Sequence, residues 1–157
     1  MQTVRVMNWV LAVEPAETAR LQATRERGSP EECACLHCRN FSAARETAYP
    51  QPFRELLNQL GIPHDRESEM WHGGESEPGL HFYAGWFHFV GHVVSGPEAH
   101  QAGPQGGPVE LAAISESFSL GFTRNIALVP VEFGDIEVGQ LEFSTHVPWV
   151  LQETFVG

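Results

Sequence analysis

Hydrophobic and polar residues alternate near the start of the chain and again through its last third, which is typical of β-strands that bury one face. The pattern over residues 3–13 predicts a first strand, and residues 18–24 are predicted to form a second strand that pairs back on it. Further strands are predicted over residues 109–114, 117–123, 126–133 and 138–147. Turn-forming residues at 124–125 and 134–135 keep the connections short, so we expect an antiparallel meander.

A helical period replaces this alternation in residues 51–61. Apolar residues at positions i, i+3, i+4 and i+7 predict one buried helix face: Phe53, Leu56, Leu57 and Leu60. Gly61 suits the C-terminal cap of this helix. An earlier helix is predicted over residues 35–48, because their composition favours helix and the residue before Pro50 avoids the α region.

The middle of the chain is rich in aromatic and β-branched residues between positions 80 and 96, with glycines at 85 and 91. We expect one long strand or a pair bent at a glycine, buried on both faces as a central strand. The alternative is an apolar pocket with His88 as its polar group. Residues 64–79 are predicted to be loop with a short strand at 69–71, and residues 95–108 a surface loop.

Together these elements predict an α+β fold in a single domain spanning residues 1–157, a mostly antiparallel sheet with two short helices after the first strands. The hydrophobic share of 42% is ordinary for a globular chain. We see neither a signal peptide nor a run of about 18 apolar residues, so we expect a cytoplasmic protein that does not bind membranes.

The net charge of −11 comes from 20 acidic residues against nine arginines, with no lysine. A surface this acidic repels phosphate backbones, so nucleic-acid binding is not expected. The absence of lysine also excludes Schiff-base catalysis and a P-loop.

All three cysteines fall within six positions, in the stretch ECACLHCRNF. In a reducing compartment such clustering favours a metal site. The spacing of Cys33, Cys35 and Cys38 allows a single turn of the chain to bind a zinc ion. Zinc prefers four ligands, so a distant histidine, a carboxylate or water must complete the set. We name His88, on the predicted long strand, as the fourth ligand, with His81 and His92 as alternatives; His37 is expected to point away.

Two other interpretations of the thiols stay open. The Cys35-Leu36-His37-Cys38 segment at a predicted helix start could act as a redox pair, because amide groups there lower a thiol pKa. The surrounding pattern lacks the strand and βαβ unit that such enzymes use. The third interpretation is simple packing of small thiols against a helix end.

Several segments also resemble a family of small uncharacterised bacterial proteins. The resemblance rests on ECACLHCRNF, YPQPFRELLNQLGI, GLHFYAGWFHFVGHV, SESFSLGFT and QLEFSTHVPWVL, which occur in this order and cover residues 33–151. It implies one compact domain, and it implies no substrate or mechanism.

The sequence therefore predicts a small domain in which a cysteine cluster binds zinc for stability. A metal- or thiol-dependent enzyme that uses the same cluster is the first alternative, with its small-molecule ligand unknown. A homodimeric interaction module that uses a sheet edge or Trp149 is the second.

Overall fold

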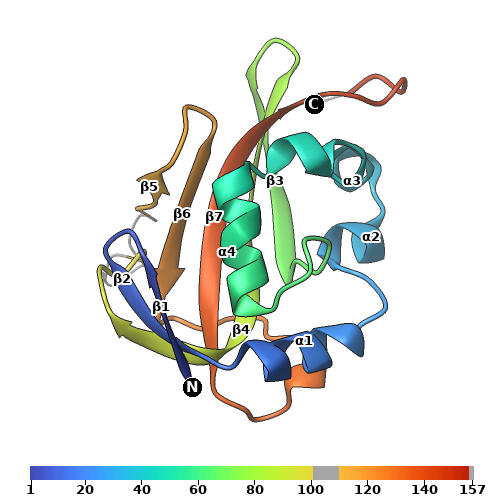
Figure 1. Cartoon of the computed structure of the whole chain (residues 1–157). Helices are drawn as coiled ribbons and strands as arrows, with labels where there is room; N and C mark the ends of the chain where they lie inside the picture. Colours follow the sequence, from blue (N-terminus) through green and yellow to red (C-terminus); the bar gives the residue numbers. More distant parts are fainter. Residues whose placement is uncertain (101–109, 156–157) are drawn as a thin grey trace.

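The computed structural model describes residues 1–100 and 110–155. Their strands form one seven-stranded antiparallel sheet in the order β1-β2-β4-β7-β6-β5, and β3 also pairs with β4 (Figure 1). The strands are β1 (Gln2–Val6), β2 (Trp9–Val13), β3 (Glu69–Glu77), β4 (Leu80–Ser95), β5 (Ala112–Ala113), β6 (Phe118–Thr123) and β7 (Val138–Pro148). The α+β class with a mostly antiparallel sheet is confirmed.

Four α-helices lie between β2 and β3 in the described part of the chain: α1 (Pro15–Ala23), α2 (Ser29–Cys33), α3 (Leu36–Ala48) and α4 (Gln51–Leu60). The predictions for α3 and α4 are confirmed, and Gly61 caps α4 in the left-handed conformation at φ 80°. The sequence missed α1 and α2. None of these helices combines the length and apolar character that crossing a membrane requires.

The long strand β4 organises the sheet, because it pairs with β7 along one edge and with two different strands along the other. Its first half pairs with β3, and its last residues pair with β2. Gly91, at φ 139°, lies where β2 begins to pair. A Cβ at this position would lie 2.0 Å from the carbonyl oxygen of Ala12, so only glycine fits the close approach.

Helix α1 occupies the gap that β2 and β3 leave along this edge of β4. The hydroxyl of Thr18 accepts a hydrogen bond from the Val90 amide at 2.9 Å, and the amide of Gln22 donates to the His88 carbonyl at 3.2 Å. Both side chains are fully buried. Residues 18–24 were predicted to form a strand, and that prediction is wrong: in a helix, positions 18 and 22 share one face, which satisfies the unpaired strand edge.

Other element boundaries also differ from the predictions. Residues 3–13 form two strands of a hairpin, with Met7 at φ 51° in its turn. Residues 126–133 are not a strand; they form a loop and a short 3-10 helix, η1 (Val131–Phe133). β3 is longer than residues 69–71, and β5 is much shorter than the strand predicted at 109–114. Most of the loop predicted at 95–108 lies outside the described residues.

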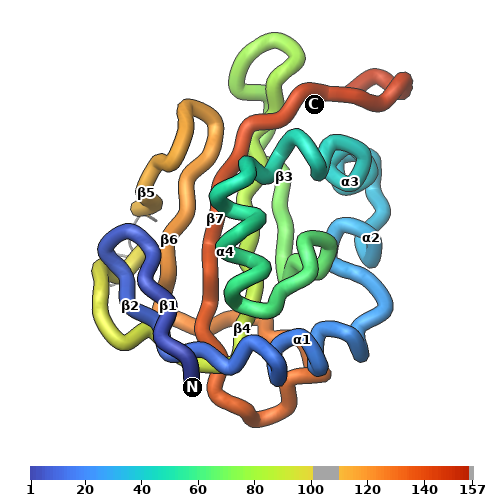
Figure 2. Tube along the Cα trace, viewed as in Figure 1, coloured from blue at the N-terminus to red at the C-terminus, as the bar shows by residue number. Residues whose placement is uncertain are grey.

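Helices α3 and α4 cover one face of the sheet, as the ribbon and the chain trace show (Figures 1 and 2). Fully or nearly fully buried aromatic rings from both layers meet there: Phe41, Tyr49, Phe53, Phe87, Phe118 and Phe143. Because side chains alternate along a strand, Tyr83 and Phe87 of β4 point to this helix-covered face and Trp86 to the opposite one. We call the opposite face the open face.

Candidate metal centre

The cysteines lie at the junction of α2 and α3. Helix α2 ends at Cys33, and Ala34 then takes the left-handed conformation at φ 52°. Cys35 is extended and precedes α3, where its carbonyl accepts the Arg39 amide at 2.8 Å. Cys38 follows within the first turn of α3. This reversal brings the three side chains together, although α2 and α3 are separate helices.

The three Sγ atoms all lie within 4.8 Å of one another, and the Cys33 and Cys35 sulfurs are 3.2 Å apart. All three thiols are free. A zinc ion bound by thiolates at about 2.3 Å separates its sulfurs by about 3.8 Å in a tetrahedral site. The observed cluster therefore matches three corners of such a site in donor type and approximate size.

Partly buried charges link α2 to α3. Arg45 of α3 donates to the Glu31 carboxylate at 2.9 Å, and Ser42 also bonds to Glu31. The same guanidinium donates to fully buried Glu67 at 3.0 Å, which also accepts the Tyr49 hydroxyl at 2.6 Å. Glu31 lies two residues before Cys33, so this network positions the exposed thiol of the cluster.

The three thiols differ in environment. Cys33 is exposed, and its pKa lies below the ordinary value because the Cys35 side chain and amide hydrogen-bond to it. Cys38 is buried, and burial together with the neighbouring Cys35 thiol raises its pKa. Without a cation, the cluster therefore favours the thiolate form at exposed Cys33 and disfavours it at buried Cys38. A metal ion would supply the positive charge that three thiolates need.

A row of three imidazoles, His37, His72 and His81, leads away from the cysteines. His37 Nε2 lies 3.2 Å from Cys35 Sγ, and the His37 and His72 rings stack at 4.9 Å. His72 Nε2 lies 2.9 Å from His81 Nδ1. Burial and the neighbouring His37 and His81 lower the pKa of His72 to about 4. We call these residues the histidine row.

The histidine row is fixed by aromatic and backbone contacts. Tyr83 donates to the His37 carbonyl at 2.7 Å, and Trp149 and Phe155 of the C-terminal segment pack on His81 at 4.9 and 4.7 Å. His81 Nε2 is buried without a hydrogen-bond partner, and the Glu75 carboxylate lies 3.6 Å from it. Trp149, a candidate for a dimer contact from sequence, here covers the end of the row.

The structure does not bring His88 to the cysteines. His88 is fully buried, with Nε2 2.9 Å from Gln140 Oε1 and Nδ1 2.8 Å from the Ser68 hydroxyl. Gln140 Oε1 also accepts the Ala127 amide at 2.8 Å, so it acts as an acceptor and His88 Nε2 carries the proton. Both ring nitrogens are thus engaged. His92 lies at the far end of β4 and pairs with Glu137 at 3.0 Å.

Strand parity could have identified the histidines near the cysteines. His81 shares a face with Tyr83 and Phe87, which the helices cover, whereas His88 lies on the other face. His72 pairs with Tyr83 across β3 and β4, so it faces the same way. His72 was not considered as a neighbour of the cysteines because residues 64–79 were predicted to be mostly loop. His37 was left out because its side chain was expected to point away.

Comparisons of the chain with protein-family models, with curated proteins and with solved structures found no match. The resemblance to a family of small bacterial proteins stays a prediction. The arguments about function therefore depend on the geometry of the site.

Proposed function

We propose that the chain is a zinc-binding domain in which Cys33, Cys35 and Cys38 bind one ion that ties α2 to α3. The observation that supports it is the gathering of all three sulfurs within 4.8 Å at the junction of two helices. Soft thiolate donors favour zinc over magnesium or calcium, which prefer oxygen. The ion would stabilise the fold by linking α3 to α2, a short helix in which only Pro30 is buried.

His37 is our proposed fourth ligand, in place of His88. It lies on the same turn as the cysteines, and its Nε2 already approaches Cys35 Sγ at 3.2 Å. Its ring lies outside the group whose donors are all within 4.8 Å of one another, so ligation requires a rotation of the side chain toward Cys33 and Cys38. The stacked His72 ring would then orient the ligand from behind.

Cobalt substitution tests this assignment. Co²⁺ in place of zinc should give thiolate-to-metal charge-transfer absorption and the intense visible bands of a tetrahedral ion, at one ion per chain. Cys35→Ser should weaken binding strongly. His37→Gln should shift the visible bands and weaken binding about 10- to 100-fold, as loss of a ligand or its support does.

His64→Gln is the matched control, because His64 lies in the loop after α4 and contacts Asn58. It should leave the spectrum unchanged. Zinc and cobalt contents far below one per chain would refute the metal site. Unchanged visible bands in His37→Gln would refute His37 as the fourth ligand. The three cysteine thiolates would then remain as the proposed protein ligands.

A further inference from the structure

The open face of the sheet carries a cavity of about 630 Å³ that is separate from the cysteine cluster. Its floor consists of small residues in register on neighbouring strands, namely Ala84 of β4, Ser144 of β7 and Ser119 of β6. Larger side chains rise around this floor. The volume lies in the range of small-molecule sites, which run from about 300 to 1,000 Å³.

Aromatic rings form the walls on the side of β3 and β4. Trp71 and Phe82 meet edge to face with centroids 5.6 Å apart, and Trp86 stands farther along β4. The Trp86 indole donates to the Ala127 carbonyl at 3.1 Å, which fixes its ring. Trp71 remains 48% exposed, a large exposure for a tryptophan. On the side of β6, Leu111 lines the cavity.

A carboxylate lies at the inner end of this aromatic wall. Glu142 is only 6% exposed and pairs with Trp86 across β7 and β4. His100 Nε2 bonds to its Oε2, and Gln140 Nε2 donates to the same oxygen at 3.1 Å. Neither donor engages Oε1.

The carboxylate is held in place by the polar network behind it. Gln140 cannot reverse its amide, because its Oε1 accepts from both His88 and the Ala127 amide. Its NH₂ group is therefore directed at Glu142. Such a fixed acceptor costs little reorganisation when a ligand binds.

Charge selects the class of ligand. Glu142 and His100 are the only ionisable side chains among the described residues that line the cavity. No arginine is available there for an anion, and the net charge of −11 repels anions from a distance. Faces of tryptophan and phenylalanine attract organic cations, and a buried carboxylate supplies the opposite charge.

We propose that the open-face cavity binds a small organic ammonium cation, with Trp71, Phe82 and Trp86 around its methyl or methylene groups and Glu142 Oε1 facing its charge. This proposal goes beyond zinc binding and does not depend on it.

The test compares choline with 3,3-dimethylbutan-1-ol, its neutral isostere with carbon in place of nitrogen. Titration calorimetry on the full chain, with sodium chloride matched to choline chloride, should give one choline site. We expect choline to bind at least about tenfold more tightly than the alcohol, since desolvated cation–π contact and a carboxylate together exceed about 1.4 kcal/mol. Equal affinities, or no saturation by choline below about 10 mM, would overturn the proposal.

Variants locate the site. Glu142→Gln should weaken choline binding about tenfold and abolish its advantage over the alcohol. Trp71→Ala should weaken it about three- to tenfold, and this variant should fold because Trp71 is half exposed on β3. Unchanged choline affinity in folded Trp71→Ala would overturn the proposal even if Glu142→Gln failed to fold.

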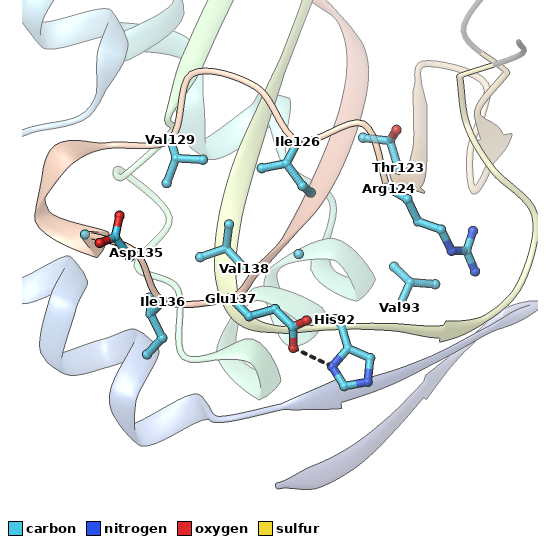
Figure 3. A pocket seen from close by; sticks show the side chains of 12 residues that line it. His92, Val93, Thr123, Arg124, Ile126, Val129, Asp135, Ile136, Glu137 and Val138 are labelled. Carbon is cyan, nitrogen blue, oxygen red and sulfur yellow. Dashed lines mark hydrogen bonds and ion pairs between the residues drawn. The ribbon is translucent and has the colours of Figure 1, made fainter.

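A second cavity provides the control (Figure 3). It holds about 560 Å³ and is lined by apolar side chains such as Val93, Ile126 and Val138, and the Glu137 carboxylate turns toward His92 at its rim. Glu137→Gln removes the same charge from a different place, so choline affinity should stay within about twofold of the wild type. An equal loss in Glu137→Gln and Glu142→Gln would mean that only net charge matters, and would overturn the assignment.

Discussion

At the scale of single residues, the histidines show how environment decides chemistry. His88 and His81 lie seven positions apart on one strand, and both are fully buried. His88 satisfies both ring nitrogens with Ser68 and Gln140, whereas His81 has a buried nitrogen without a hydrogen-bond partner. The first arrangement holds a neutral side chain in the core, and the second belongs to the row beside the thiols.

The buried His88 should make stability depend on pH. Burial lowers its pKa from 6.5 to about 4, so the unfolded chain takes up a proton before the folded chain does. This effect is absent above about pH 7, and as the pH falls through 6.5 toward 4 it removes up to about 3 kcal/mol of unfolding free energy. Denaturant titrations across this pH range would measure it.

The variant His88→Gln removes this titration. It should be less stable than the wild type at pH 7 by about 1–3 kcal/mol, because a glutamine cannot satisfy both partners. The difference should shrink toward pH 4, whereas His64→Gln should follow the wild-type profile. A constant difference between His88→Gln and the wild type would contradict the assigned role.

At the scale of elements, the contacts between neighbouring helices and strands decide where the functional side chains lie. The α2–α3 junction gathers the thiols, and the Glu31–Arg45 ion pair links the two helices. Along the edge of β4 that does not pair with β7, α1 takes the place of a strand between β2 and β3. At the contact of α1 with β4, polar side chains of the helix satisfy backbone groups that the strand leaves unpaired.

Loosening α2 should weaken metal binding more than it weakens the fold. Glu31→Ala removes the contacts to Arg45 and Ser42, and we expect zinc affinity to fall about tenfold, with about 1 kcal/mol lost in unfolding free energy. Competition with a chromophoric chelator would measure the affinity. Glu32→Ala, an exposed position on the same helix, is the control and should bind zinc like the wild type. Equal affinities for both variants would show that α2 needs no anchor.

Position 91 of β4 should tolerate no side chain. Gly91→Ala places a Cβ against the Ala12 carbonyl oxygen and also forces a left-handed φ, so it should cost about 3 kcal/mol or more in unfolding free energy. Gly79→Ala separates the two effects, because its φ is 79° but no atom lies within 4 Å of the added Cβ. It should cost only about 1 kcal/mol. Thermal melts would measure the loss of stability in each variant. Equal losses in Gly91→Ala and Gly79→Ala would contradict the steric argument.

At the scale of the whole molecule, one sheet separates two sites on its two faces. The cysteines and the histidine row lie on the helix-covered face, and the open-face cavity lies on the other. Strand alternation alone produces this separation, since neighbouring residues of β3 and β4 contribute to opposite sites. His72 follows Trp71, and His81 precedes Phe82.

Zinc should raise the stability of the folded chain. At zinc concentrations about 100-fold above the dissociation constant, ligation adds about 2.7 kcal/mol, which for a chain of this length raises the melting temperature by about 5–10 °C. Differential scanning calorimetry with zinc and with a chelator would measure the shift. Magnesium should produce none, and Cys35→Ser should respond to neither ion. A zinc response that survives in Cys35→Ser would place the binding elsewhere.

The sequence by itself determined the fold class, helices α3 and α4, the long strand and the clustering of the thiols. These features depend on local periodicity and on residues close in the chain, which a one-dimensional pattern records. Cys33, Cys35 and Cys38 could be predicted as one group because six positions span them, whatever the rest of the fold does.

Only the tertiary structure decided which histidines join them, why residues 15–23 form a helix, and where the open-face cavity lies. Each depends on which face of β4 a residue occupies and on what covers that face. The helix at Thr18 and Gln22 forms because a strand edge over 65 positions away needs partners. Long-range hydrogen bonding and packing outweigh weak local preferences, and the local pattern does not contain them.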